Sequence, residues 1–383
     1  MNFIAHIRES DKTIQTVEDH LLAAKELAET YGDKLGVKHL TGLAGMLHDL
    51  GKYSNEFREY ILQAVNNPEA PPKRGSVDHS TAGGKLLYEF FHKKIISRYK
   101  GLVAEVVGNA IISHHSYLQD FLNPDLESNY LNRVRDKELK DFETVKSIFF
   151  EQVISEQNFQ NYVEEAASEL EAFLVNESSE NTEEQLMFLT KFVFSALIDA
   201  DRTNTRLFED NKFTEEAVNH EKLFSTYYEK VINKINSFKN HPNALTAINL
   251  LRAEMSVQCD EFAEKPSGVY TLSIPTGGGK TLASLRYALK HAKLFNKKRI
   301  IYVVPYTTII EQNAEEVRNI LKDAGNILEH HSNVIGDENE NDEMQDGVMS
   351  VSQKLKLAKD NWDSPIIFTT MVQFLNVLYL KGI

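Results

Sequence analysis

The chain has 383 residues, which at about 150 residues per domain indicates two or three domains. Its 42 basic residues against 56 acidic ones give a formal net charge of −14, and its 42% hydrophobic and 26% charged residues exclude a mostly disordered chain, a collagen-like chain and a small disulfide scaffold. Because proteins that wrap duplex DNA over a long footprint are usually basic, any contact with nucleic acid is expected to be local, or to depend on metals or a partner.

The cellular location follows from what the sequence lacks. The single cysteine, Cys259, excludes an intramolecular disulfide and favours a reducing compartment. Residues 1–10 have no apolar core of a secretory signal, and the apolar stretches at residues 102–112 and 188–198 are too short and too interrupted to span a bilayer. We therefore expect a cytoplasmic monomer that does not contact membranes.

The first part of the chain, up to about residue 230, is predicted to be mainly helical. Residues 17–28 place their apolar side chains on one side of a helix. The connections contain turn-forming residues, as in a proline-rich loop at residues 66–76 and a polar loop at residues 176–181. Apolar residues with the same helical spacing occur at residues 40–50, 80–91, 102–113, 141–152, 162–175 and 184–201.

Beyond residues 240–243, short apolar runs alternate with helical patterns, which implies a parallel sheet. An acidic loop at residues 336–347 interrupts the alternation. We therefore expect a multi-domain protein, with an all-α bundle at residues 1–235 and an α/β lobe at residues 236–383 that is incomplete at its C-terminal end. The predicted strands are residues 269–274, 300–304 and 365–369, and the predicted helices are residues 244–259, 281–294 and 308–321.

A glycine-rich loop joins the first predicted strand of this lobe to a helix. Glycines let backbone N–H groups approach phosphate closely, and the helix N-terminus adds a favourable dipole. Lys280 would reach the outer phosphates of ATP, and Thr281 would place its hydroxyl on Mg²⁺. The strict pattern has glycine at the position of Ile274, and an ordinary glycine-rich turn is the alternative interpretation. The candidate ATP-binding residues are Thr276, Gly277, Gly278, Gly279, Lys280 and Thr281.

Histidines and aspartates in the helical part form a set suited to metals. Imidazole nitrogens and carboxylate oxygens together suit Mn, Fe, Co, Ni or Zn rather than Mg alone. The alternative is that these histidines are scattered over a helical bundle without a common site. The set consists of His20, His48, Asp49, His79, His114 and His115, with Asp199 or Asp201 on a later helix.

Two metals about 3.5–4 Å apart can activate a water and stabilise both oxygens of an in-line phosphoryl displacement, and Asp49 could bridge them with its two oxygens. Lys52, one turn beyond His48, could neutralise developing phosphate charge. Adjacent residues on a helix point about 100° apart, so His114 and His115 fit one site best if their helix ends there. One metal would be held by His20, His48 and Asp201, and the other by His79, His114 and His115.

These motifs give the chain a resemblance to a known family. The N-terminal part resembles a His-Asp (HD) domain nuclease, and the lobe that follows resembles the first recombinase-like (P-loop) lobe of a superfamily 2 helicase. This combination is similar to the helicase–nuclease effector of type I CRISPR–Cas systems. Ala200-Asp201 resembles the last element of the HD pattern, which favours Asp201 over Asp199 as the ligand. The matching segments are residues 19–20, 48–52, 78–80, 113–115, 195–202, 275–281, 305–313 and 369–374.

The resemblance implies a metal-dependent nuclease that nicks and degrades single-stranded DNA in antiviral defence. In this family a guide-RNA surveillance complex recruits the enzyme, and ATP-driven translocation feeds DNA to the metals. The implied cofactors are two divalent transition-metal ions (Mn, Fe, Co or Ni) and ATP with Mg. Residues 301–314 and 366–378 are similar to the second and third helicase blocks, in which threonines at strand ends touch the nucleic-acid backbone. The corresponding residues are Thr307, Thr308, Thr369, Thr370 and Gln373.

The helicase half of this interpretation has a gap. No Asp-Glu box follows Lys280 to hold the metal and orient water, and the family continues well past position 383. We therefore expect ATP binding without useful hydrolysis or helicase activity from this chain alone, while metal-dependent cutting should survive. Two other functions stay open: an HD-type phosphohydrolase acting on dNTPs or cyclic nucleotides, and a non-catalytic ATP-binding docking module.

Overall fold

The structure is a computed structural model. Its described residues divide into two compact units, one within Met1–Glu215 and the other within Glu216–Asn339 and Ala358–Leu380. The predicted acidic loop at residues 336–347 and most of the polar loop at residues 176–181 lie outside the described residues. No helix in the described part of the chain has the length and apolar character of a membrane span. The described residues are 3–8, 10–67, 70–73, 75–94, 97–176, 182–214, 218–331 and 362–377.

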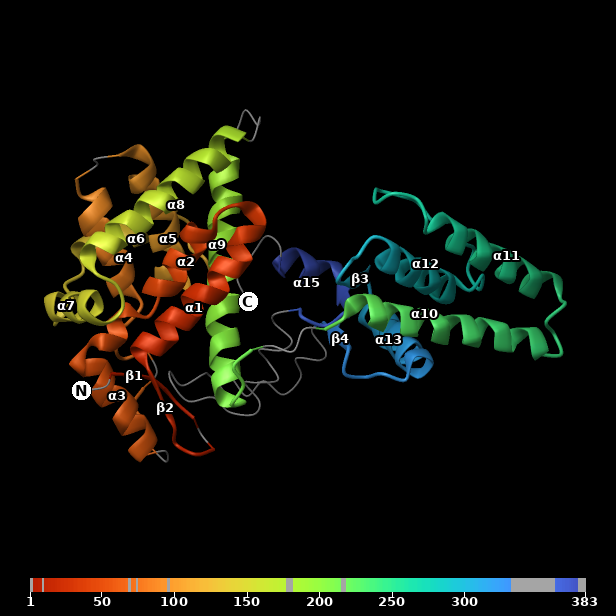
Figure 1. Ribbon diagram of the computed structural model, residues 1–383. Helices are drawn as coiled ribbons and strands as arrows, with labels where there is room; N and C mark the ends of the chain where they lie inside the picture. The colour runs from red at the N-terminus through yellow and green to blue at the C-terminus, as the bar shows by residue number, and fades with distance from the viewer. Residues whose placement is uncertain are drawn as a thin grey trace. The chain divides into compact units, whose positions relative to one another are not determined.

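The first unit begins with a hairpin that the sequence patterns did not predict. β1 (Ile4–Ile7) pairs antiparallel with β2 (Ile14–Thr16), and both strands are too short to show a clear alternation. Thr16 then caps α1 (Val17–Gly32) by accepting a hydrogen bond from the backbone N–H of Asp19. The helices that follow are α2 (Lys38–Leu47), α3 (Asn55–Asn66), α4 (Thr81–Leu87), α5 (Arg98–Ser113), α6 (Asn129–Leu131), α7 (Phe142–Gln152), α8 (Glu156–Asn176) and α9 (Thr182–Glu209) (Figure 1).

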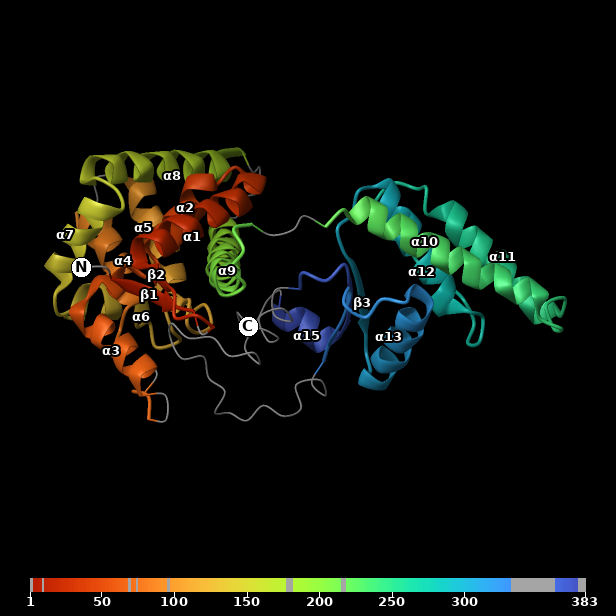
Figure 2. The same ribbon diagram turned by 60° about the horizontal axis from the view of Figure 1, so that its bottom comes forward.

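Helices α2 and α5 form the centre of the first unit. α2 is buried from Leu40 to Leu47, and α5 is buried without interruption from Val106 to Ser113. Helices α1, α4, α8 and α9 pack against one or both of them, and α8 crosses over the bundle in Figure 2. Because the C-terminal ends of these two central helices lie inside the unit, His48, Asp49 and His114, which follow them, are buried, whereas His115 is exposed.

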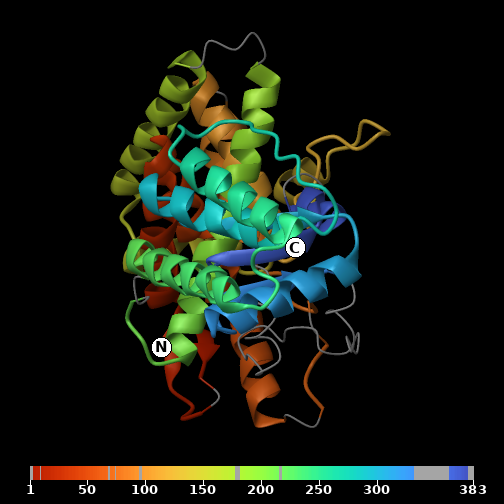
Figure 3. The same cartoon turned by 90° about the vertical axis from the view of Figure 1, so that its right-hand side faces the viewer.

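The second unit is an α/β lobe whose three described strands form a parallel sheet in the order β3-β5-β4. Figure 3 shows the cyan α12 above the strands and the blue α13 below them. A helical bundle followed by a partial parallel α/β lobe was the predicted fold, and it is confirmed. The strands are β3 (Ile300–Val304), β4 (Ile327–His330) and β5 (Ile366–Thr370), and the helices are α10 (His220–Ser237), α11 (Ala247–Phe262), α12 (Lys280–Leu294), α13 (Thr307–Leu321) and α15 (Met371–Leu375).

The predicted strand at residues 269–274 is not formed, and that prediction is wrong. This segment pairs with no described strand, and Val269 is fully exposed. An apolar run becomes a strand only when a neighbouring strand satisfies its backbone groups. The prediction missed β4 for the opposite reason: Ile327–His330 includes Glu329 and His330, so it is not an apolar run, yet β5 lies beside it.

Helix α10 packs within the second unit. Its apolar residues Phe224, Tyr227 and Val231 share one core with α12, α13 and the sheet. The sequence interpretation placed the domain boundary at residue 235, whereas the compact units divide between Glu215 and Glu216. The amphipathic pattern of α10 is the same whichever partner it covers, so only tertiary packing assigns the helix to a unit.

Candidate metal centre and phosphate-binding loop

Three segments of the first unit bring a first cluster of His and Asp side chains together. His20 lies on α1, Asp201 lies on α9, and His48 and Asp49 follow the last residue of α2. Asp49 leaves the helical conformation, with φ −110° and ψ 24°, and the 3₁₀ turn Leu50–Tyr53 begins after it. The buried end of α2 therefore presents both side chains to the interior.

The ligand-type atoms of this first cluster lie within 4.8 Å of one another. His20 Nε2 is 3.1 Å from His48 Nε2 and 3.2 Å from Asp49 Oδ2. Asp201 Oδ1 is 3.4 Å from His20 Nε2 and 3.5 Å from His48 Nε2. The structure thus brings together the residues that the sequence assigned to one metal.

A second cluster shares Asp49 and adds His79, His114 and His115. α5 ends at Ser113, so the two adjacent histidines fall at a helix end, where both can face one site. His79 Nε2 is 2.6 Å from His115 Nε2, and Asp49 Oδ1 is 3.4 Å from His114 Nε2. Asp49 therefore faces the first cluster with Oδ2 and the second with Oδ1, which is the geometry that a bridging carboxylate requires.

The donor atoms fit a cation. His48 Nδ1 is 2.9 Å from the carbonyl of Gly45, and His114 Nδ1 is 2.6 Å from the carbonyl of Ile111. These contacts place a proton on Nδ1, so that Nε2 is the atom available to the cluster. Asp49 Oδ1 and His114 Nε2 are buried and have no hydrogen-bond partner among the described residues. Buried acceptors that face one another need a proton or a metal ion between them, so the set suits divalent transition metals.

Charge in the first cluster also favours a cation at its centre. Burial disfavours ionisation of His48, but the Asp49 and Asp201 carboxylates outweigh it and raise the pKa of His48 to about 10. Burial also disfavours the ionised form of the two carboxylates. Lys52 and His48 nevertheless hold the pKa of Asp49 well below its ordinary value. A hydrogen bond from His48 likewise lowers the pKa of Asp201. A metal ion would take the place of a proton here, so metal binding should release protons.

Lys52 lies beside Asp49 in the interior. Its Nζ is 2.7 Å from Asp49 Oδ2 and donates to the carbonyl of Ala5 at 3.3 Å. The ammonium is also 5.4 Å from the centre of the Phe57 ring. Its charge is directed at the shared carboxylate, and the role of Lys52 toward a phosphate stays a prediction.

The structure separates the two aspartates that competed for the last ligand position. Asp201 belongs to the first cluster, whereas Asp199 belongs to neither cluster. Asp199 and Asp201 are two residues apart on a helix, so their side chains point about 200° apart. Only one of them can face His20, and in this structure it is Asp201.

Gly51 lies where the segment carrying His79 touches the turn after Asp49. Its backbone N–H donates to the His79 carbonyl at 3.1 Å, and a Cβ on Gly51 would lie 2.5 Å from that oxygen. Gly51→Ala is therefore expected to lower the free energy of unfolding by about 1–3 kcal/mol, the usual cost of overpacking. Urea unfolding would measure this loss. Gly101→Ala is the control, because a Cβ there would lie 4.0 Å from its nearest neighbour; equal stability of the two variants would contradict the expectation.

Arg133 was missed by the sequence reasoning, and it links the segment carrying His79 to the end of α5. Its guanidinium donates to Thr81 Oγ1 at 2.6 Å, to Ser80 Oγ at 2.8 Å and to the carbonyl of Ile112. A single arginine in a polar stretch carries no signal of such a role. The contact fixes the two segments of the second cluster relative to each other.

Asp78 adds a pH-dependent part to this link, since it pairs with both Arg133 and Lys137. Burial raises the pKa of Asp78, but hydrogen bonds from Lys137 and Thr81 outweigh it and hold that pKa well below its ordinary value. A depressed folded-state pKa means that the carboxylate stabilises the fold above its unfolded pKa of about 3.9, and that this contribution is lost as the pH falls below it. Asp78→Asn should therefore lower the melting temperature at neutral pH, with a smaller difference from wild type near pH 3. Melting followed by circular dichroism would test this, and a difference independent of pH would refute it.

The predicted phosphate-binding loop directly precedes α12, which begins at Lys280. Gly277 and Gly279 have φ values of 76° and 80°, a conformation that favours glycine. A Cβ on Gly278 would lie 2.6 Å from Ile274 Cγ2. The backbone of the loop therefore depends on all three glycines, which an ordinary turn does not require.

Three hydrogen bonds hold the loop in place. Arg252 on α11 donates to the carbonyl of Gly277 from Nε and Nη2, at 2.8 and 2.5 Å. Thr281 Oγ1 donates to Asn313 Oδ1 on α13 at 3.2 Å. The sequence reasoning assigned no role to Asn313. Lys280 is exposed, so its ammonium is accessible to a ligand.

The predicted nucleic-acid contacts lie at the carboxyl ends of β3 and β5. Residues 307–308 open α13 after β3, and Thr370 Oγ1 caps α15 by accepting from the backbone N–H of Gln373 at 3.2 Å. Thr369 is buried, and its hydroxyl donates to the carbonyl of His330 at 2.9 Å. The Thr369 side chain is therefore occupied within the fold rather than presented to a ligand.

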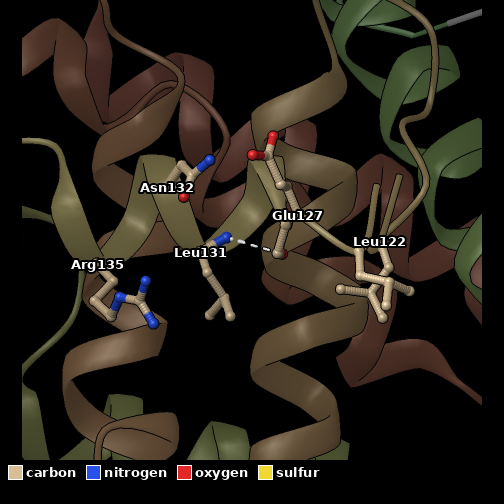
Figure 4. Close-up of a pocket in the computed structure, with 7 residues that line it drawn as sticks. Leu122, Glu127, Leu131, Asn132 and Arg135 are labelled. Atoms are coloured by element: carbon tan, nitrogen blue, oxygen red, sulfur yellow. Dashed lines mark hydrogen bonds between the residues drawn. The ribbon is translucent and has the colours of Figure 1, made fainter. Parts of the chain in front are cut away.

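A pocket of about 290 Å³ lies between the loop after α5 and the helical residues of α6 and the following turn Asn132–Asp136. In Figure 4, Leu122 and Glu127 lie on one side of it, and Leu131, Asn132 and Arg135 lie on the other. None of the predicted site residues lines this pocket. The two His–Asp clusters and the glycine loop therefore remain the candidate sites.

Two family models match the chain. Residues 17–142 match the model described as HD domain, and residues 246–381 match the model described as DEAD/DEAH box helicase. The chain contains an HD domain followed by a DEAD/DEAH box helicase segment. All the predicted metal ligands except Asp201 fall within the HD match, and the glycine loop falls within the helicase match. No curated protein matches the chain.

Similar solved structures come from T. fusca. The structure described as T. fusca Cas3-ATP is 18% identical with a TM-score of 0.46, over 98% of this chain and 43% of that chain. The structure described as T. fusca Cas3 is 17% identical with a TM-score of 0.45, over 100% of this chain and 45% of that chain. The chain with its HD domain and helicase segment thus spans less than half the length of these structures.

Proposed function

We propose that the HD domain is a metal-dependent nuclease that hydrolyses phosphodiester bonds in single-stranded DNA, and that the protein acts in type I CRISPR antiviral defence. The observation that carries this proposal is the arrangement around Asp49, whose two oxygens each face a separate group of imidazoles. Two groups that share one carboxylate suit a pair of metals, the arrangement that two-metal phosphoryl displacement uses.

Each part of the centre has a role in this proposal. His20, His48 and Asp201 would hold one metal, His79, His114 and His115 would hold the other, and Asp49 would contact both. When bound, Mn, Fe, Co or Ni ions would activate a water and neutralise the oxygens of the phosphate. Lys52, 2.7 Å from Asp49, would limit the negative charge of the shared carboxylate.

The helicase segment would bind ATP with Mg. Gly277, Gly278 and Gly279 would present backbone N–H groups to the phosphates, Lys280 would neutralise their charge, and Thr281 would contact the Mg ion. Thr276 precedes the first of these glycines. Residues 307–308, Thr370 and Gln373 would contact the DNA backbone. The net charge of −14 supports delivery to DNA by a partner, for which we propose a guide-RNA surveillance complex.

The test is degradation of labelled circular single-stranded DNA with Mn²⁺, Co²⁺ or Ni²⁺ and no ATP. Cutting that stops when EDTA removes the metal is the expected result. The same preparation should be given dNTPs and cyclic dinucleotides. Turnover of these nucleotides without DNA cutting would indicate that the protein is a nucleotide phosphohydrolase and not a nuclease. A folded protein with neither activity and no bound metal would instead be a docking module.

A further inference from the structure

One histidine of the first cluster is held by a side chain rather than by the backbone. His20 Nδ1 is 2.7 Å from Asn204 Oδ1. A backbone carbonyl is fixed by the fold, whereas a side-chain amide can rotate, so the orientation of His20 depends on that of Asn204. The other cluster histidines with a partner at Nδ1 face backbone carbonyls: His48 faces Gly45, His79 faces Val77 and His114 faces Ile111.

Asn204 is itself oriented by a second amide. Nε2 of Gln15 donates to Asn204 Oδ1 at 2.9 Å, and both side chains are buried. An amide oxygen only accepts, so its neighbour at His20 Nδ1 must carry the proton. The lone pair is then on His20 Nε2, the atom 3.2 Å from Asp49 Oδ2 and 3.4 Å from Asp201 Oδ1.

The N-terminal hairpin supplies Gln15 and holds the last turns of α9 at two further points. Arg8 Nε donates to the carbonyl of Phe208 at 2.8 Å. His6 Nε2 is 2.8 Å from Glu209 Oε1 in a buried contact. These contacts fix the part of α9 that carries Asn204, which follows Asp201 by three residues and so lies on the same face of the helix.

We propose that Asn204 is a positioning residue that, oriented by Gln15, keeps His20 in the tautomer whose Nε2 faces a metal, and so sets the metal affinity of the first cluster. The inference rests on the metal centre in the proposed function, but it concerns metal binding and not DNA cutting. Groups that hold the outer nitrogen of a metal-bound histidine commonly change metal affinity about 10–100-fold.

The experiment is a Mn²⁺ titration of the full chain, followed by calorimetry and fitted with two sites. Asn204→Leu removes the acceptor with little change of size, and it should weaken one Mn²⁺ site about 10–100-fold while sparing the other. Asn204→Asp keeps an acceptor oxygen and should bind Mn²⁺ at least as tightly as wild type. Gln15→Met removes only the orienting donor and should weaken the same site less.

Asn109→Leu is the matched control. Asn109 is a buried asparagine on α5 that donates to the carbonyl of Gln119 at 2.8 Å and contacts no cluster residue in that bond. The Asn109→Leu variant should have a lower melting temperature than wild type, but neither Mn²⁺ site should be weakened selectively. If Asn204→Leu does not fold, the comparison of Asn204→Asp and Gln15→Met with wild type carries the test.

Three results would overturn the proposal. The first is unchanged Mn²⁺ affinity in folded Asn204→Leu. The second is Mn²⁺ binding by Asn204→Asp that is weakened as much as in Asn204→Leu. The third is a weakening of both Mn²⁺ sites in Asn204→Leu that is matched in Asn109→Leu at the same loss of melting temperature. If Asn204→Leu does not fold, the proposal is overturned by wild-type Mn²⁺ affinity in Gln15→Met or by weaker Mn²⁺ binding in Asn204→Asp. Selective weakening in a protein that does not cut DNA would support this inference while rejecting the proposed function.

Discussion

Asp49→Ala is expected to abolish metal-dependent cutting of circular single-stranded DNA while leaving ATP binding unchanged. Asp49 is the residue that both clusters share, with Oδ2 at 3.2 Å from His20 Nε2 and Oδ1 at 3.4 Å from His114 Nε2. The substitution removes a ligand from each metal position at once. Because a metal ion contributes several kcal/mol to stabilising such a transition state, the rate should fall by about 10³-fold or more.

The measurement is the initial rate of cutting with Mn²⁺, together with the metal content of the purified protein. Asp49→Asn is the second variant, because it keeps the shape of the side chain beside Lys52 and separates loss of charge from loss of packing. Asp199→Ala and Asp201→Ala form a matched pair on α9. The first should keep cutting activity and the second should lose it. Wild-type cutting by folded Asp49→Ala would reject the proposed centre.

Lys280→Ala is expected to give the reverse result. Lys280 is the first residue of α12 and is exposed at the end of the glycine loop, where it would meet the outer phosphates of ATP. Hydrogen bonds to charged groups contribute about 1.5–3 kcal/mol, so ATP binding should weaken about 10–100-fold. Metal-dependent cutting should continue at the wild-type rate, because no residue of the metal clusters belongs to this loop.

Binding of Mg-ATP by calorimetry would measure this effect. Lys293→Ala is the matched control, since Lys293 is an exposed lysine near the opposite end of the same helix and should not contact the nucleotide. Equal ATP affinity in the two variants would reject the phosphate-binding role of the loop. Loss of cutting in Lys280→Ala would show that the two sites do not act independently.

The residues of the candidate metal centre could be proposed from the sequence because their types restrict the chemistry. Histidine and aspartate are common metal ligands, and a set of them in one helical domain favours a metal site over other roles. The same reasoning had no access to Asn204, Gln15 or Arg133. Amides and single arginines occur throughout protein surfaces and interiors, so their residue type indicates no role without the contacts that they make.

The three glycines of the candidate phosphate-binding loop could likewise be predicted from the sequence, since lysine and threonine follow them at a fixed spacing. The strand expected before the loop was predicted wrongly. Residues 269–274 have the apolar character of a strand, but strand formation also needs a partner, and no described strand lies beside them. The helices were predicted more accurately than the strands because a helix satisfies its backbone hydrogen bonds within one segment.

By itself the sequence determined the helical and α/β parts, the residue types of the candidate metal centre and the position of the glycine loop, because each of these depends on composition or on local spacing. Only the tertiary structure decided that α10 packs with the second unit, that Asp201 rather than Asp199 faces His20, and that the oxygens of Asp49 face different clusters. These outcomes depend on contacts between distant segments, such as His20 and Asn204, which are 184 residues apart. Local patterns carry no information about which distant segments meet.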